Sequence, residues 1–282
     1  MARSATHAAA ALSAGLLFAL GASASPEDDD RRRDGGGAGF ERIATLANYL
    51  NNAPEQFGET TVSEIVAATQ DGRTLVYTDS PLGQVGFVDI SDASSPVPTG
   101  TVDVGGEPTA VDVLGNALAL VAVNTSPSFT APSGKLVVID MATRSIVREL
   151  DLGGQPDSLK ISPDRRYAAI AIENERDEDV SDGELPQLPA GYLAIVDLAG
   201  RAPAAWTRRD VALTGLATYA PQDPEPEFVD VNERNEAVVT LQENNHIVMV
   251  DLASGSIVAH FPAGAATIDA IDTSDNRPAI VA

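Results

Sequence analysis

Short apolar runs rich in Val, Ile, Leu and Ala recur along most of the chain, and polar turn residues follow each of them. Four of these runs end in an Asp, and they occupy residues 85–89, 136–140, 193–197 and 247–251. Successive Asp residues of this set are 51, 57 and 54 positions apart. Runs of this length and composition favour β-strands. No stretch after residue 24 shows a sustained helical period of 3.6 residues. The pattern therefore predicts an all-β repeat.

Three further runs accompany each Asp-terminated run. An upstream run lies at 74–78, 117–123, 167–172 and 237–241, and an opening phrase lies at 64–66, 108–111, 156–159 and 226–229. A closing run is clearest at 146–150 and 256–260. Four short strands in each unit of about 50 residues are typical of a β-propeller blade. We expect four-stranded antiparallel blades at about 57–105, 106–153, 154–222 and 223–263, with a partial fifth at 264–282.

The number of units bears on how the propeller closes. A ring of blades closes on itself and so covers its sheet edges, and four blades is the low end of what closes. The start of a fifth unit predicts that these residues are the N-terminal part of a longer ring, which would be incomplete here. The alternative is a complete four-bladed ring with a frayed tail. In either case the recurring Asp most simply accepts hydrogen bonds in the turn that follows it.

The N-terminal segment has a different character. Residues 1–24 are typical of a secretory signal peptide, with Arg3 at the start, an apolar run at 11–20 and small residues at 22–24. The apolar run is too short to span a bilayer of roughly 30 Å, although an internal hydrophobic helix is the alternative. Residues 25–56 form an acidic and glycine-rich tether, expected to be disordered, and a lead-in segment. The mature protein is thus predicted to be periplasmic or extracellular, without a transmembrane segment.

Composition removes several classes of function. The chain has 41 acidic and 18 basic residues, a formal net charge of −23, no cysteine and three histidines. A surface of this charge does not suit nucleic acid. Without cysteine there are no disulfides, iron–sulfur clusters or thiol nucleophiles. A G-x-S-x-G nucleophile elbow and a phosphate-binding P-loop are also absent from the sequence.

Acidic and amide residues mark one end of the predicted blades. In a propeller, the turns between the second and third strands and the residues that lead into the first strands meet at one mouth of the central channel. The candidates for a metal site there are Glu64, Asp157, Glu173, Asn174, Glu175, Glu227, Glu243 and Asn244. Oxygen ligands without His or Cys suit Ca²⁺ first and Mg²⁺ second. The alternative is that these acidic loops are simply solvated surface.

Other polar or aromatic residues have less specific interpretations. A loop of roughly twenty residues separates two strands of the third unit, and its segment from Asp177 departs from the EF-hand pattern. His246 is expected to be a structural residue, and the alternative is a functional pair with Glu243. Trp206 is expected to pack at a blade edge, and the alternative is an exposed ring that stacks on a ligand.

Three stretches carry a family resemblance. Residues 170–176, 183–191 and 224–245 resemble the exported bacterial family named choice-of-anchor I, whose near relatives are labelled "esterase-like activity of phytase" or alkaline phosphatase. Residues 238–245 also resemble the Tyr-Val-Thr-Asn repeat of surface-layer-type propellers. The resemblance covers about residues 41–282 and implies a β-propeller. Members are longer, so any esterase-like module would lie beyond residue 282 and its catalytic residues cannot be transferred to this chain.

Two functions follow from the sequence, and whether the chain is an enzyme stays open. The first is an exported binding or scaffold propeller with an acidic, calcium-binding mouth that presents a surface to an unidentified ligand or protein partner. The alternative is a calcium-dependent phosphoesterase, or an esterase-like hydrolase resembling phytase, whose catalytic part lies largely outside this chain. Phosphate chemistry needs cationic groups near the ions, and the plausible ones are Lys135, Lys160, Arg165, Arg166 and Arg176. Because the predicted mouth is so acidic, binding is preferred.

Overall fold

A computed structural model describes residues 41–177, 179, 183–198, 200 and 202–265. Every described strand belongs to one compact unit that begins at Arg42. The predicted signal peptide, the tether up to residue 40 and the fifth unit beyond residue 265 lie outside the described residues. In the part that is described, no helix has both the length and the apolar character needed to cross a membrane.

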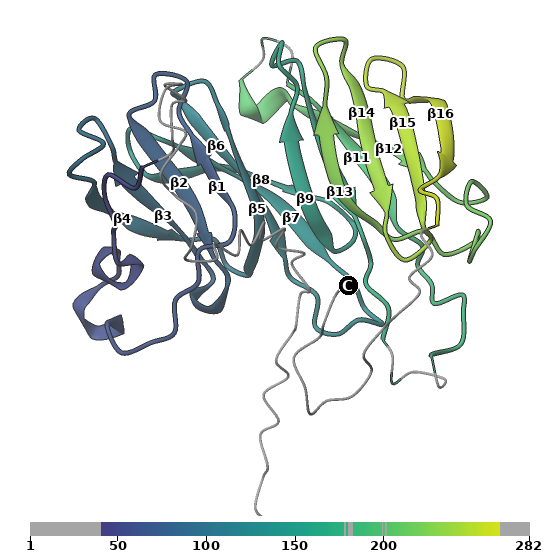
Figure 1. Ribbon diagram of the computed structural model, residues 1–282, viewed down its shortest axis with the longest axis horizontal. Coiled ribbons are helices and arrows are strands. Elements are labelled where there is room, and N and C mark those ends of the chain that lie inside the picture. The colour runs from purple at the N-terminus through teal and green to yellow at the C-terminus, as the bar shows by residue number, and fades with distance from the viewer. Residues whose placement is uncertain (1–40, 178, 180–182, 199, 201, 266–282) are drawn as a thin grey trace, which may run out of the picture. The chain divides into compact units, whose positions relative to one another are not determined.

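Four antiparallel sheets of four strands follow one another along the chain (Figure 1). The first contains β1 (Val66–Ala68), β2 (Thr74–Asp79), β3 (Gln84–Asp89) and β4 (Val97–Asp103). The second contains β5 (Glu107–Leu114), β6 (Leu118–Asn124), β7 (Gly134–Asp140) and β8 (Ser145–Asp151). The third contains β9 (Pro156–Ile161), β10 (Tyr167–Ile172), β11 (Tyr192–Asp197) and β12 (Thr207–Ala212). The fourth contains β13 (Pro226–Val231), β14 (Glu236–Leu241), β15 (His246–Asp251) and β16 (Ser256–Pro262).

The first strands of the sheets lie side by side in chain order. Strand β1 contacts β5, β5 contacts β9, and β9 contacts β13. Each sheet is therefore a blade whose first strand is innermost, which is the arrangement of a β-propeller. The predicted all-β propeller with four-stranded antiparallel blades is confirmed. Short 3₁₀ turns occur at η1 (Asn48–Asn51), η2 (Pro54–Gln56), η3 (Ser80–Leu82) and η5 (Pro203–Ala205).

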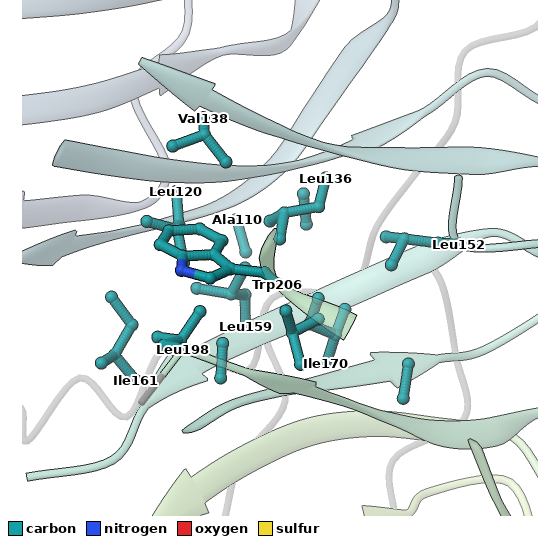
Figure 2. Close-up of a cluster of buried hydrophobic side chains, with 14 of the residues drawn as sticks. Ala110, Leu120, Leu136, Val138, Leu152, Leu159, Ile161, Ile170, Leu198 and Trp206 are labelled. Carbon is teal, nitrogen blue, oxygen red and sulfur yellow. The ribbon is translucent and has the colours of Figure 1, made fainter. Parts of the chain in front are cut away.

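The blades are held together by apolar layers between their faces. Every residue of β10 is buried, because neighbouring blades cover both faces of the third sheet. Alternate residues of β6 illustrate the pattern: Leu120 packs toward blade three, whereas Val121 packs toward blade one. Trp206 lies in the layer between blades two and three with only 3% of its surface exposed (Figure 2). The alternative of an exposed, ligand-stacking Trp206 is therefore wrong.

Glycines at the start of third strands allow the next blade to approach. A Cβ atom on Gly134, the first residue of β7, would lie 2.2 Å from the ring Cδ of Pro156, where β9 begins. A Cβ atom on Gly191, just before β11, would lie 2.4 Å from the Cδ of Pro226 at the start of β13. No side chain fits at these separations, so only glycine permits this contact between blades.

Three of the four recurring Asp residues show the structural role that the sequence predicts. Asp89 accepts a hydrogen bond from the N–H of Ser91, and Asp140 accepts bonds from Ala142 and Thr143. Asp251 accepts bonds from both the N–H and the hydroxyl of Ser254. These bonds stabilise the charged carboxylate and lower the pKa of each of the three Asp residues.

The described part of the lead-in segment, residues 41–56, is anchored to blade one. The amide nitrogen of Asn51 donates to the Tyr77 hydroxyl at 3.0 Å and to the Phe87 carbonyl at 3.1 Å. Its oxygen accepts a bond from the N–H of Gly100 at 2.6 Å. Since Asn51 is buried, it fixes this segment against three strands of the first sheet.

Candidate functional site: an acidic channel mouth

Strand pairing brings the predicted loops together at one end of each blade. In blade three, Pro156 at the start of β9 pairs with Ile172 at the end of β10. The next residue, Glu173, then donates its N–H to the carbonyl of Gln155 at 2.9 Å. In blade four, Pro226 pairs with Leu241 in the same way. The residues leading into the first strand and those after the second strand therefore share one edge of these blades, which we call the mouth.

Carboxylates from all four blades act on one side chain at this mouth. Burial raises the pKa of Asp157 from 3.8 to about 7, and nearby negative charges add to the shift. These charges belong to Glu227, Glu175, Glu107 and Glu64. They come from blades four, three, two and one respectively. The charges of the predicted residues Glu64, Glu175 and Glu227 thus act on the predicted residue Asp157.

Glu173 is a further carboxyl of the same group. Burial raises the pKa of Glu173 from 4.5 to about 9, and the charges of Asp157, Glu175, Glu225 and Glu227 contribute. Burial also raises the pKa of Glu227, followed by repulsion from Glu243 and Glu175. Glu243 is itself exposed. We refer to Asp157, Glu173, Glu175 and Glu227 as the mouth carboxylates.

The two predicted amide residues are engaged by the backbone. The oxygen of Asn174 accepts the N–H of Gln155 at 2.9 Å, and its nitrogen donates to the carbonyls of Pro189 and Ala190. The oxygen of Asn244 accepts the N–H of Glu225 at 2.9 Å. Its nitrogen donates to carbonyls of the preceding loop, at Tyr219, Ala220 and Asp223. Both side chains are buried and hold the lead-ins to β9 and β13 in equivalent ways.

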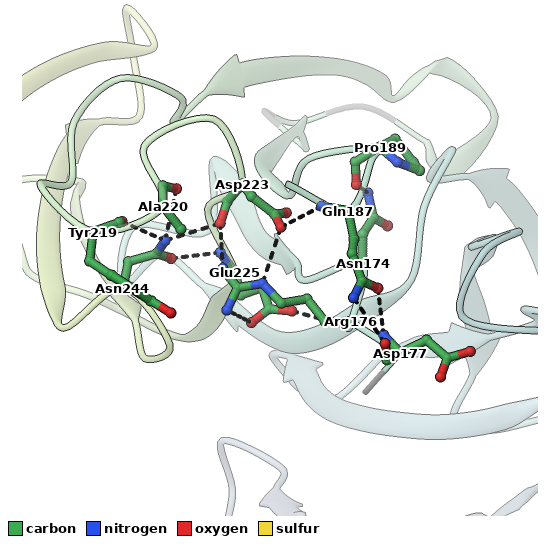
Figure 3. Close-up of polar contacts among 10 residues, drawn as sticks. All are labelled: Asn174, Arg176, Asp177, Gln187, Pro189, Tyr219, Ala220, Asp223, Glu225 and Asn244. Carbon is green, nitrogen blue, oxygen red and sulfur yellow. Dashed lines mark hydrogen bonds and ion pairs between the residues drawn. The ribbon is translucent and has the colours of Figure 1, made fainter. Parts of the chain in front are cut away.

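An arginine network ties the long loop of blade three to blade four (Figure 3). Arg176 forms ion pairs with Asp223 and with Glu225, both at 3.1 Å, and donates its own N–H to Glu225. Asp223 also accepts the N–H of Gln187 at 2.8 Å, and Gln187 exchanges two hydrogen bonds with Asp177. Burial raises the pKa of Glu225 to about 7 even though Arg176 opposes the shift. This network fixes the wall of the mouth.

Sequence reasoning missed Gln155, which lies beside the mouth carboxylates. Its amide nitrogen donates to Glu175 at 3.2 Å, whereas its buried oxygen accepts a hydrogen bond from no described residue. A sequence signal was present, because Gln155, Glu107 and Glu225 all precede the proline that opens a first strand. The opening phrase begins at that proline and so does not contain the polar residue before it.

The mouth carboxylates are close enough to repel but are not arranged as a finished metal site. Among the described residues, no group of three or more His, Asp or Glu side chains is placed so that it could hold a metal ion. Side-chain rotation would be needed to gather the oxygens around one ion. The metal prediction for this cluster therefore remains a prediction.

His246 contacts another histidine. Its Nε2 lies 3.0 Å from Nδ1 of His260 on the neighbouring strand β16, in place of a contact with Glu243. Burial lowers the pKa of His246, and the positive charge of a protonated His260 lowers it further. The pair joins β15 to β16, in line with a structural role.

Comparison with known proteins gives a family and a fold. A family model described as "Choice-of-anchor I domain" matches residues 64–280. No curated protein matches this chain.

Among solved structures, a catalytically inactive virginiamycin B lyase from Staphylococcus aureus with quinupristin is 13% identical, with a TM-score of 0.50 over 72% of this chain and 56% of that one. A Bacteroides uniformis protein provisionally named a 6-phosphogluconolactonase is 14% identical, with a TM-score of 0.50 over 72% and 55%. The chain thus spans little more than half of these two relatives. At such identities, these likenesses show the propeller fold alone.

Proposed function

Because the chain belongs to the choice-of-anchor I domain family, we propose that it is an exported β-propeller that binds a ligand or protein partner, with calcium held at its acidic mouth. The proposal is supported by the strand pairing that puts the lead-ins to the first strands and the residues after the second strands at one edge. The charges of Glu227, Glu175, Glu107 and Glu64 act there on Asp157. Keeping several carboxylates together is unfavourable unless protons or cations neutralise them. A divalent cation neutralises the cluster at a pH where protons no longer do so.

The chemistry of the donors favours calcium. The mouth carboxylates supply hard anionic oxygens, and Gln155 supplies a neutral amide oxygen that is buried and accepts no hydrogen bond from the described residues. An amide oxygen beside carboxylates is a usual part of a Ca²⁺ shell, whereas Mg²⁺ demands a stricter octahedron. Glu64 and Glu243 would add negative charge at the rim. Asn174 and Asn244 would keep the strand lead-ins in place.

The competing phosphoesterase function is less well supported by the basic residues. Arg176 is paired with Asp223 and Glu225, Lys160 with Asp112 and Lys135 with Glu149. Three of the five plausible cations are therefore engaged by carboxylates, which makes the approach of an anionic phosphate to the mouth less favourable. Binding is preferred for that reason. Hydrolysis of a chromogenic phosphate ester, with and without Ca²⁺, would reverse this preference if it depended on the ion.

Titration of the chelator-treated protein with CaCl₂ in a calorimeter tests the proposal. We expect saturable binding at neutral pH with release of protons, since the ion displaces protons from carboxyls of raised pKa. The heat should therefore change with the ionisation enthalpy of the buffer. At a free Ca²⁺ concentration 100 times the Kd, the folded state should gain about 2.7 kcal/mol. The absence of both binding heat and any change in Tm on chelation would refute the calcium site.

A further inference from the structure

A pocket of about 230 Å³ adjoins the acidic mouth, between a loop of blade two and the long loop of blade three. Phe129 and Thr130 line it from the blade-two loop. Glu184, Pro186 and Leu188 line it from the long loop, and Glu175 lines it from the mouth. The pocket therefore has apolar sides and a carboxylate at two places along its wall.

The apolar side chains of this pocket are unusually accessible. Phe129 exposes 42% of its surface and Leu188 exposes 68%, although most large apolar residues of the blades are buried. Exposed apolar side chains that share one hollow are typical of surfaces that bind a partner. Removal of this area from water would favour a ligand that carries an aliphatic stem.

The walls of the pocket are held in place before any ligand arrives. The amide nitrogen of Asn174 donates to the carbonyls of Pro189 and Ala190, and Gln187 donates its N–H to Asp223. Gln155 donates to Glu175 and so orients this carboxylate. Since the loop and one acidic group are already fixed, a ligand loses less free energy in ordering them.

We propose that this pocket binds a lysine or arginine side chain of a protein partner. Glu175 and Glu184 complement the cationic head, and none of the described residues that line the pocket is basic. Phe129, Leu188 and the prolines fit the aliphatic stem, and an aromatic face also attracts a cation. The volume is below the roughly 300–1,000 Å³ of sites for drug-sized ligands, which suits a single side chain. The inference rests on the proposed binding function and names its partner chemistry.

Short capped peptides that differ only at the central residue test this inference. Acetyl-Gly-Lys-Gly-amide and its Arg counterpart should bind at least about tenfold more tightly than the Gln counterpart, a difference of about 1.4 kcal/mol, and the Glu counterpart should not bind. Added salt should weaken binding. Equal binding of the Lys and Gln peptides, or no binding of either basic peptide, would overturn the proposal.

Two variants and a control separate this pocket from the calcium site. Glu184→Gln should weaken binding of the Lys peptide severalfold, and Leu188→Ser should weaken Lys and Gln peptides together. Glu233→Gln removes an exposed carboxylate from the turn between β13 and β14, which lies away from the mouth, and should leave peptide binding unchanged. An equal loss in Glu184→Gln and Glu233→Gln would mean that only the overall charge matters and would refute the pocket.

Both variants at the pocket are expected to bind Ca²⁺ as the parent protein does, because neither residue belongs to the mouth carboxylates. Failure of peptide binding with intact Ca²⁺ binding would remove this inference alone. Failure of Ca²⁺ binding with intact peptide binding would remove the calcium site alone.

Discussion

Asp157 shows how position within the propeller changes the chemistry of an ordinary residue. In the sequence it is one acidic residue among 41. In the structure its burial, followed by the negative charges of carboxylates from four blades, raises its pKa to about 7. The exposed Asp140 has the opposite environment, because turn N–H groups stabilise its charge and lower its pKa. Asp157 is therefore suited to exchange a proton for a cation, whereas Asp140 is suited to hold a turn.

Replacement of Asp157 by Asn tests this assignment. The change keeps the shape of the side chain but removes a charge that its neighbours repel. Without calcium at pH 8, we expect Asp157→Asn to raise the free energy of unfolding by about 1 kcal/mol or more. With saturating calcium, the stabilisation by the ion should be lost or at least halved, because a ligand is missing. Both effects are measured by thermal unfolding with and without chelator.

Glu233→Gln is the matched control for this substitution. It also removes one carboxylate, but from an exposed turn away from the mouth. It should change neither the calcium-free stability nor the response to calcium by a comparable amount. A variant Asp157→Asn that unfolds earlier than the parent without calcium would contradict the assignment.

At the scale of the strand and blade, each sheet depends on how closely its neighbour can approach. Gly134 and Gly191 occupy equivalent positions where the third strands start. They face Pro156 and Pro226 of the following blades. The amide side chains of Asn174 and Asn244 hold the residues just before these two prolines. The same joint is thus built twice from a glycine, a proline and an asparagine. It positions the first strand whose lead-in contributes to the mouth.

Replacement of Gly134 by Ala should disturb this joint. The new methyl group would overlap the Pro156 ring and also the carbonyl oxygen of Gly154, which lies 2.6 Å from the Cβ position. Overpacking of this kind typically costs about 1–3 kcal/mol of folding free energy. Denaturant unfolding measures the loss. Gly58→Ala is the control, since no atom lies within 4 Å of the Cβ position there. Equal effects of the two substitutions would contradict the packing explanation.

At the scale of the whole molecule, the net charge of −23 and the buried carboxyls together determine how stability depends on pH. Asp157, Glu173 and Glu225 have pKa values of about 7, 9 and 7 in the folded protein, above their ordinary values of 3.8, 4.5 and 4.5. At pH values between the ordinary and the raised pKa values, the folded state therefore binds more protons than the unfolded state. The resulting stabilisation is fully present below about pH 4 and is lost as the pH rises through 7 to 9.

The calcium-free protein should consequently lose stability between pH 6 and pH 9. The Tm, measured in chelator at low salt, should fall across this range, and added NaCl should reduce the fall by screening repulsion. Saturating calcium should make the Tm nearly independent of pH over the same interval. A Tm that rises from pH 6 to pH 9 in chelator would contradict both the raised pKa values and the role proposed for the ion.

Much of this architecture could be predicted from sequence, because its signals are local and repeated. The Asp-terminated run is repeated four times, and the alternation of apolar runs with turns is sufficient to indicate four-stranded blades. The family match over residues 64–280 is consistent with the resemblance found in the sequence. The partners of single side chains could not be predicted. His246 pairs with His260, and Trp206 is buried between two blades. Both contacts depend on packing between strands, and so their partners are not written in the neighbouring sequence.

By itself, the sequence determined the strand order, the blade repeat and the acidic character of the loops, since periodicity, turn chemistry and charge are properties of neighbouring residues. Only the tertiary structure decided which acidic residues act on one another. Glu64 and Glu227 are far apart in the chain, yet both influence Asp157 because the first strands of successive blades lie side by side. It also decided that Asn174 and Asn244 hold backbone while Gln155 borders the mouth. The physical reason is that burial and charge–charge distance are set by packing between blades, which no single stretch of sequence contains.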